Sequence, residues 1–296
     1  MRLALCNEVL REREFAEQCA YAAALGYDAL EVAPFTLSDD PLTLTAEQRA
    51  GVRRAASDAG IAISGLHWLL LKPEGLSVTS PDASVRRQTI EAMRGLVALC
   101  ADLGGRYLVH GSPLQRRTPA GVEVGVASDW IADALDVAAR AAAEANVLYL
   151  IEPLPRDETD QINTLDEAIA LVRRIDSPSL ATMLDTKSAA LAEATPADEL
   201  LRKWLPSGLI AHVQLNDRNR RAPGQGEDRF GPALRALIDG GYDGDIAIEP
   251  FDYVPDGPAC AARAAGYIRG LLETIDAQRT AQAPDSVCVL AQASRP

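Results

Sequence analysis

The run DIAIEPF (residues 245–251) is apolar from Ile246 until it reaches a carboxylate at Glu249. Three other apolar runs in the second half of the chain also end on a side chain that can bind a metal: Glu152 in VLYLIEP (147–153), Asp185 in LATMLD (180–185) and Gln214 in IAHVQLND (210–217). The four polar residues lie about 30 residues apart. In a barrel of parallel strands, the C-terminal strand ends and the loops after them form one face, where catalytic groups gather. The pattern therefore predicts a divalent-metal site in a (β/α)8 enzyme.

Short β-like runs alternate with longer helical patterns along the whole chain, which predicts a parallel sheet with helical crossovers. The expected strands are Arg2–Cys6, Ala29–Ala33, Ala62–His67, Tyr107–His110, Leu148–Glu152, Ala181–Asp185, Ile210–Leu215 and Ile246–Glu249. A helical stripe from Val85 to Leu103 is closed by a glycine pair, Gly104-Gly105. Ala-rich Asp129–Ala145 is a second helix, and Thr164 opens a third with capping-box chemistry. We predict a single (β/α)8 TIM barrel over residues 1–279, followed by a tail at 280–296.

The composition is that of an ordinary soluble globular protein, with 48% hydrophobic and 24% charged residues among 296. A formal charge of −13 argues against a nucleic-acid or anionic-membrane partner, either of which needs a basic face. No apolar stretch approaches the roughly 20 residues of a membrane span. The five cysteines are scattered and lack metal-site spacing: Cys6, Cys19, Cys100, Cys260 and Cys288. We therefore expect reduced thiols and a cytoplasmic protein.

Two stretches carry a resemblance to a known family: NDRNRRAPGQG (216–226) and GYDGDIAIEPF (241–251). The chain resembles the xylose isomerase-like sugar isomerase/epimerase superfamily, and within it the D-tagatose 3-epimerase/D-psicose 3-epimerase branch, from about residue 3 to residue 274. Those epimerases have a similar Asn-Arg-Arg-x-Pro-Gly-x-Gly segment after strand seven and a metal-binding Glu in Glu-Pro-Phe after strand eight. The resemblance implies that Glu152, Asp185 and Glu249 bind a divalent metal. It also implies that Glu158 and Arg220 contact the sugar and that Glu152 and Glu249 move protons.

The chemistry of the four strand-end residues agrees with that implication. Three carboxylates and an amide oxygen form an all-oxygen site, which suits Mn²⁺ best, with Mg²⁺ or Co²⁺ as alternatives, rather than zinc. A metal chelated by the carbonyl and a neighbouring hydroxyl of a ketose would stabilise the enediolate that forms on deprotonation. Two carboxylates on opposite sides of the substrate carbon can then remove and return a proton, which inverts the stereocentre.

The sequence departs from the family pattern at two positions. Gln214 stands where members usually have His. The dehydroshikimate dehydratases of the same superfamily are similar to this chain in having Gln there, and Gln is an acceptable oxygen ligand. Ser188 stands where members usually have a substrate-contacting His, three residues after the metal-binding Asp. The second departure puts the standard ketohexose in doubt and leaves open that Lys187 or Ser188 meets a different substrate group.

Other candidate residues have both a functional and a structural interpretation. His67 and His110 end the third and fourth strands, so each could contact the substrate in the pocket or serve the structure. His212 shares the face of Gln214 one step deeper, so we interpret it as a hydrogen-bonded core histidine and the rival fourth ligand. Trp68 could pack on a sugar ring or within a loop. The pair Arg116-Arg117 could meet an anionic group of the substrate or lie in a solvated loop, and the solvated position is the commoner case.

The sequence thus predicts a metal-dependent sugar epimerase or isomerase that acts on a ketose or related carbonyl sugar through a metal-stabilised enediolate. One alternative is a metal-dependent lyase or dehydratase on a keto-cyclitol or keto-glycoside, which would expel a β-substituent from the same enolate. Another is a catalytically silent sugar-binding barrel. We expect a carbohydrate as the small-molecule partner and a homo-oligomer, either a dimer or a tetramer.

Overall fold

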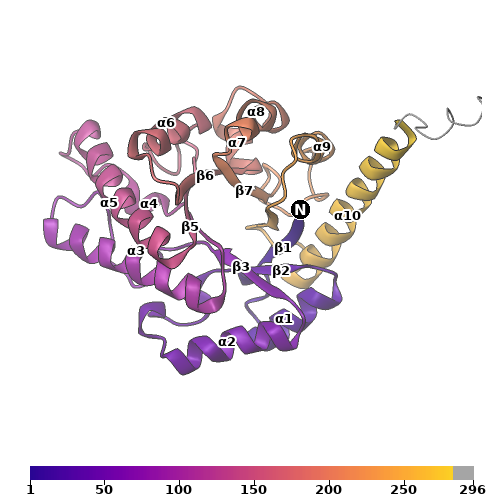
Figure 1. Cartoon of the computed structure of the whole chain (residues 1–296), viewed down its shortest axis with the longest axis horizontal. Coiled ribbons are helices and arrows are strands. Elements are labelled where there is room, and N and C mark those ends of the chain that lie inside the picture. The colour runs from indigo at the N-terminus through magenta and orange to yellow at the C-terminus, as the bar shows by residue number, and fades with distance from the viewer. Residues whose placement is uncertain (283–296) are drawn as a thin grey trace, which may run out of the picture.

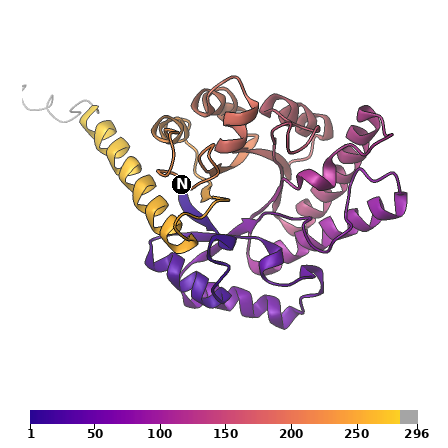
Figure 2. The ribbon, with the colours of Figure 1, turned by 180° about the vertical axis from the view of Figure 1, so that it is seen from behind.

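Eight parallel strands form a closed barrel in the order β1-β2-β3-β4-β5-β6-β7-β8 (Figures 1 and 2). This is a computed structural model, and it describes residues 1–282. The strands are β1 (Arg2–Cys6), β2 (Ala29–Val32), β3 (Ala62–Leu66), β4 (Tyr107–His110), β5 (Leu148–Ile151), β6 (Leu180–Asp185), β7 (Ile210–Leu215) and β8 (Asp245–Ile248). Every expected strand is present with bounds within one residue of the prediction, so the (β/α)8 fold class is confirmed.

Helices surround the barrel and connect its strands (Figure 1). The longer ones are α1 (Phe15–Ala24), α2 (Ala46–Asp58), α3 (Ala83–Leu103), α5 (Val124–Ala145), α6 (Leu165–Ile175), α8 (Ala197–Trp204), α9 (Gly231–Asp239) and α10 (Gly257–Gln282). Shorter pieces are α4 (Pro113–Arg116), α7 (Thr186–Ala192), η1 (Asn7–Leu10), η2 (Pro34–Thr36), η3 (Pro41–Thr43) and η4 (Leu205–Ser207). The short elements η1 and α7 follow a strand directly, and η2 and α4 begin within three residues of a strand end, so all four lie on the face where strands end.

The helix ends follow the local chemistry of the sequence. Gly104 adopts a left-handed conformation with φ of 82° at the end of α3, as the glycine pair predicts. Thr164 accepts a hydrogen bond from the backbone N–H of Glu167 at the start of α6. The Glu167 carboxylate accepts from the N–H of Asn163 instead of closing the reciprocal bond to Thr164. Only half of the predicted capping box therefore forms.

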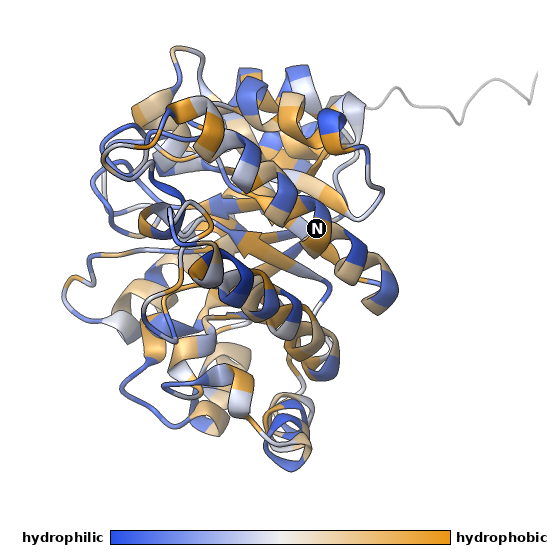
Figure 3. Ribbon diagram, turned by 90° about the vertical axis from the view of Figure 1, so that its left-hand side faces the viewer, coloured by the Kyte–Doolittle hydropathy of each residue, from blue (hydrophilic) through white to orange (hydrophobic). Residues whose placement is uncertain are grey.

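Most of the apolar core lies between the sheet and the surrounding helices, as the orange strands and two-coloured helices of Figure 3 show. Two smaller buried clusters lie apart from this core: one consists of Ala4, Cys6, Ala29 and Ala247, and the other of Tyr107, Val109, Leu150, Ala181 and Met183. The buried Asp245 carboxylate lies at the N-terminal end of β8, where it accepts hydrogen bonds from Arg2 at 2.8 Å and Arg106 at 2.6 Å. These ion pairs lie at the N-terminal end of the barrel. The polar strand-end residues lie at its other, C-terminal end.

Two predictions concern parts of the chain away from the strand ends. Cys6, Cys19, Cys100 and Cys260 are buried free thiols, as expected, while Cys288 lies outside the described residues. The predicted tail begins inside α10, which continues to Gln282, and the remainder of the tail lies outside the described residues. Among residues 1–282, no helix is long and apolar enough to cross a membrane.

Candidate active site at the carboxyl end of the barrel

The four predicted metal ligands all lie at the carboxyl ends of their strands. Glu152 directly follows β5, Asp185 ends β6, Gln214 is the next-to-last residue of β7 and Glu249 directly follows β8. The ladder pairs Asp185 with Gln214, and it pairs Gln214 with Ala247, two residues before Glu249. Paired residues of parallel strands point to the same side of the sheet. All four side chains are buried, with at most 8% of their residue surface exposed.

The three carboxylates of this group repel one another. Burial raises the pKa of Glu152 well above its ordinary value, and the nearby charges of Glu249 and Asp185 raise it further. Burial also raises the pKa of Glu249 to about 7, with Asp185 adding to the shift while His67 opposes it. Burial raises the pKa of Asp185 despite the opposing Lys187 ammonium. Such a concentration of buried negative charge is stable in ionised form only beside a cation.

Two buried acceptor atoms of the group have no hydrogen-bond donor among the described residues: Oδ2 of Asp185 and Oε1 of Gln214. Buried acceptors without a partner are rare in proteins, and an absent ion is one ordinary explanation. The close approach of Glu152 to Gly111 adds a third sign of a built site, because a Cβ at that glycine would overlap the Glu152 carboxylate. The oxygen donors present therefore fit a hard divalent cation.

His212 lies one step deeper than Gln214 and is fully buried. Its Nε2 is 2.8 Å from Oε2 of Glu31, and its ring stacks on Tyr107 with the centroids 4.3 Å apart. The prediction of a barrel-core histidine agrees with this position. The Glu31 carboxylate is thus the polar partner of Nε2, while Nδ1 has no hydrogen-bond partner among the described residues. That hydrogen bonds satisfy the whole ring stays a prediction.

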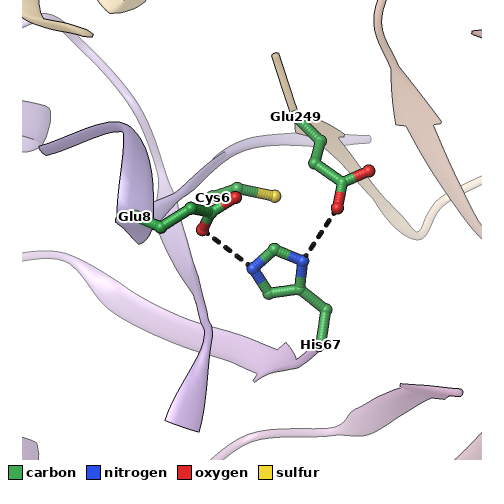
Figure 4. Close-up of side chains that lie close together, drawn as sticks. All are labelled: Cys6, Glu8, His67 and Glu249. Atoms are coloured by element: carbon green, nitrogen blue, oxygen red, sulfur yellow. Dashed lines mark hydrogen bonds and ion pairs between the residues drawn. The ribbon is translucent and has the colours of Figure 1, made fainter. Parts of the chain in front are cut away.

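His67 follows β3 and lies between two carboxylates (Figure 4). Its Nδ1 is 3.1 Å from Oε1 of Glu249, and its Nε2 is 3.0 Å from Oε2 of Glu8. Burial opposes a charge on the ring, but Glu8 and Glu249 outweigh it and raise the pKa of His67 well above its ordinary value. Cys6, Glu8, His67 and Glu249 are close enough together to hold a metal. Both ring nitrogens already contact carboxylates, however, so the charged imidazole serves as the cation of this cluster.

Lys187 and Ser188 lie in the first turn of α7, and they differ in what they reach. The backbone N–H of Ser188 donates to Oδ1 of Asp185 at 2.5 Å, while its buried hydroxyl has no described partner. The ammonium of Lys187 lies 2.5 Å from Oε1 of Glu158 and 4.9 Å from the centroid of the Phe251 ring. Lys187 therefore connects the loop after β5 with the loop after β8, whereas Ser188 orients Asp185 through its backbone.

Asn216 is a structural link that the sequence did not reveal. Its Nδ2 donates to the carbonyl of Glu249 at 3.0 Å, and its Oδ1 accepts from the backbone N–H of Lys187 at 3.0 Å. The residue is fully buried directly after β7. Asn216 thereby holds the first turn of α7 and the start of the loop after β8 in a fixed relation. A buried amide that follows a strand and precedes a turn is the sequence signal for such a role.

His110 and Arg116 flank Glu152 from the side of β4. Burial and the charge of Arg116 lower the pKa of His110 to about 3, and its Nδ1 is 2.8 Å from the hydroxyl of Tyr149. Arg116 is completely buried and donates to the carbonyl of Glu152 at 2.7 Å. The prediction of a solvated loop charge is therefore wrong for Arg116, because α4 turns it inward. The exposed Arg117 donates to the carbonyls of Asp157 and Glu158.

Arg220 lies in the loop after β7 and contacts the loop after β8. Its backbone has a φ of 70°, and its carbonyl accepts hydrogen bonds from the N–H groups of Phe251 at 2.8 Å and Asp252 at 2.9 Å. Its guanidinium lies 5.2 Å from the centroid of the Phe251 ring. The ring of Phe251 also meets Trp68 edge-on at 6.3 Å, and Trp68 meets Phe35 at 6.4 Å. Three loops thus contribute an aromatic wall to this face, and Trp68 packs within it.

The family described as Xylose isomerase-like TIM barrel matches residues 19–271. The chain belongs to this family. A D-psicose 3-epimerase from Enterocloster bolteae is 28% identical to it over 237 residues, which are 77% of this chain and 74% of that protein. An L-ribulose 3-epimerase from Mesorhizobium japonicum is 26% identical over 246 residues, which are 81% of this chain and 76% of that protein. These family members are named epimerases, which agrees with the predicted enzyme class, a sugar isomerase.

Solved structures of similar proteins show the same fold. An L-ribulose 3-epimerase superposes with a TM-score of 0.80 at 21% identity and covers 96% of this chain and 99% of its own. A D-psicose 3-epimerase crystallised in the presence of D-fructose superposes with a TM-score of 0.79 at 21% identity, over 92% of this chain and 99% of its own. The predicted xylose isomerase-like barrel is thereby confirmed.

Proposed function

We propose that this protein is a divalent-metal-dependent epimerase or isomerase of a ketose or a related carbonyl sugar. The observation that carries the proposal is the group of buried, mutually repelling carboxylates, together with two acceptor atoms that have no donor within residues 1–282: Asp185 Oδ2 and Gln214 Oε1. Glu152, Asp185, Gln214 and Glu249 would hold the cation, with Mn²⁺ as the expected ion and Mg²⁺ or Co²⁺ as alternatives. When bound, such a cation would polarise the substrate carbonyl and offset the negative charge of the deprotonated sugar.

The two glutamates would carry out the proton transfers. One carboxylate accepts the proton from the substrate carbon beside the carbonyl, and the electron pair of the broken C–H bond forms the enediolate. The other, in its protonated form, gives a proton to the opposite face of the same carbon, which inverts the stereocentre. Glu249 suits either role near neutral pH, because burial raises its pKa to about 7. His67 holds Oε1 of this carboxylate, so the group keeps a fixed direction.

The sugar would be bound by groups around this centre. The ion pair of the buried Lys187 and the half-buried Glu158 offers a donor and an acceptor to sugar hydroxyls, and Arg220 lies in the loop after β7. A guanidinium can donate two parallel hydrogen bonds to sugar oxygens. In this proposal His110 is a neutral contact residue, because burial keeps its pKa low, and Ser188 acts through Asp185.

The decisive experiment is turnover of a ketose panel by metal-loaded protein in D₂O. We expect epimerised product and deuterium at the inverted carbon, because the enediolate is reprotonated by a carboxyl group that exchanges with solvent. Metal analysis of the purified protein is done alongside. Bound metal without turnover or exchange across the panel contradicts the epimerase. A protein that binds no divalent cation under metal-replete conditions supports the silent sugar-binding barrel instead.

A lyase or dehydratase on a keto-cyclitol or keto-glycoside is the second candidate, and Gln214 favours it, because the resembling dehydroshikimate dehydratases also have Gln at this position. β-Elimination needs an acid for the leaving group, and Glu152, whose pKa burial raises well above its ordinary value, would be such an acid in its protonated form. Elimination would produce a conjugated enone, so an ultraviolet absorbance that grows with a keto-glycoside distinguishes the lyase from the epimerase. The homo-oligomer and the cytoplasmic location stay predictions, and light scattering after size-exclusion chromatography would test the former.

A further inference from the structure

Glu31 is a buried carboxylate in the middle of the apolar strand β2, with no exposed surface. Its Oε2 accepts a hydrogen bond from the hydroxyl of Tyr107 at 2.5 Å, and Nε2 of His212 lies 2.8 Å from the same atom. Its Oε1 accepts from Nε2 of Gln214 at 2.7 Å. Both oxygens are therefore surrounded by groups that carry hydrogens, so Glu31 acts as an acceptor on both sides.

This arrangement determines which end of the Gln214 amide is free. An amide has a donor nitrogen at one end and an acceptor oxygen at the other, and only the oxygen binds a hard cation. Glu31 takes the nitrogen end, so Oε1 of Gln214 is left buried and without a donor among the described residues. The reversed amide would place its oxygen against the Glu31 carboxylate and its NH₂ group toward the other ligands. Two acceptors in contact, without a shared hydrogen, are strongly unfavourable.

We propose that Glu31 is a positioning residue that fixes the Gln214 amide with its oxygen toward the cation. This inference rests on the proposed metal site. A histidine at position 214 would have less need of such a partner, because it can ligate a metal through a ring nitrogen in either orientation. A glutamine ligand has only one productive orientation. Glu31 thus explains how this chain uses Gln where the resembling epimerases use His.

The test is a double-mutant cycle on Mn²⁺ affinity, with Glu31→Gln and Gln214→His made singly and together. The dissociation constant is measured on metal-free protein from the electron paramagnetic resonance signal of free Mn²⁺, and circular dichroism checks the fold. Glu31→Gln should weaken Mn²⁺ binding about 10–100-fold, as the loss of a ligand-orienting partner does. It also removes a negative charge, which weakens binding of a cation in either background. Because the charge effect is shared, a clearly smaller loss in the Gln214→His background isolates the effect of orientation.

Two further variants keep the inference testable if Glu31→Gln folds poorly. Gln214→Glu should bind Mn²⁺ more weakly than the wild type, although carboxylate is the stronger ligand, because its second oxygen would meet Glu31. Tyr107→Phe is the matched control, since it removes a hydrogen bond from the other oxygen of Glu31, and its affinity should stay within about threefold. Tighter binding by Gln214→Glu, or an equal loss from Glu31→Gln in both backgrounds, overturns the inference while the metal site stands. A wild-type protein that binds no Mn²⁺ overturns the proposed metal site itself.

Discussion

The ammonium of Lys187 lies 2.5 Å from Oε1 of Glu158, and this ion pair joins the first turn of α7 to the loop after β5. Only 4% of the Lys187 side chain is exposed, against 28% of that of Glu158. Burial alone would lower the pKa of Lys187, but Asp185 and Glu158 outweigh it and raise the pKa. A charged lysine is thus held close to the proposed metal ligand Asp185. It directly precedes Ser188, the position at which the resembling epimerases usually have a histidine.

Lys187→Met tests whether this charge serves the substrate. Methionine keeps much of the side-chain length and the contact with Phe251, but it removes the donor. We expect kcat/KM to fall on the order of 10²-fold, as when a charged donor to a reacting oxygen is lost. Mn²⁺ affinity should stay the same or rise, because a positive charge near Asp185 and Glu152 is gone.

The matched control is Lys203→Met, which removes an exposed lysine that pairs with Asp166 on the outer surface. Its kcat/KM should stay within about twofold of the wild type, because exposed ion pairs contribute little. If both lysine variants keep full activity, Lys187 is a structural ion-pair partner and the substrate contact must be sought elsewhere.

The metal-free protein should lose stability as the pH rises from 5 to 8. Burial raises the pKa of Glu249 from 4.5 in the unfolded chain to about 7 in the folded protein. The folded state therefore holds this proton more tightly, so stability falls once the pH passes 4.5 and the full loss is reached above 7. For Glu249 the loss is on the order of 3 kcal/mol. His67 acts in the same direction, because its raised pKa gives stability below pH 6.5 that is lost as the pH rises through the folded value.

Urea unfolding at pH 5 and pH 8, with and without Mn²⁺, measures this dependence. Added Mn²⁺ should restore more stability at pH 8, where its ligands are ionised, than at pH 5. The Glu249→Gln protein should show a flatter pH dependence, weak metal binding and no turnover. A metal-free wild type that is more stable at pH 8 than at pH 5 contradicts the assignment of these carboxylates.

Substitutions of Gln214 and of His212 should have different effects on Mn²⁺ affinity. Gln214→Ala removes the proposed ligand and should weaken Mn²⁺ binding at least tenfold, whereas Gln214→His should bind at least as well as the wild type. His212→Ala should keep the metal but lose about 2–4 kcal/mol of stability, because a cavity opens beside Tyr107 and Glu31 loses a neighbour. Calorimetric titration and urea unfolding measure the two effects. Loss of metal in His212→Ala alone would make His212 the fourth ligand.

The barrel could be predicted from the sequence because strands buried on both faces are short apolar runs. The site residues could be predicted because they lie where these runs end. Glu152, Asp185, Gln214 and Glu249 could be proposed together for this reason. The role of Glu31 was missed, although a carboxylate inside the apolar run ALEV is itself a signal of a buried polar partner. The contacts of Arg116 and Lys187 could not be read from the sequence. They depend on how α4 and α7 are rotated after their strands, which only long-range packing decides.

The role of Arg220 can be tested against two other arginines of the same loop, Arg218 and Arg221. Arg218 pairs with Asp228 at 2.6 Å, and Arg221 is exposed. Arg220 is also exposed, with its Nε 3.5 Å from Oδ1 of Asp252, but its guanidinium lies over the Phe251 ring at the edge of the site. Arg220→Ala keeps a Cβ at the same positive φ, so the backbone strain is unchanged while the guanidinium is lost. We expect kcat/KM to fall about 10²–10³-fold with metal content unchanged, as when a donor to a developing oxyanion is removed. Arg221→Ala should be nearly neutral in the same ketose assay. Equal small effects from both variants would place Arg220 on the surface as an ordinary charge and leave Lys187 as the cationic substrate contact.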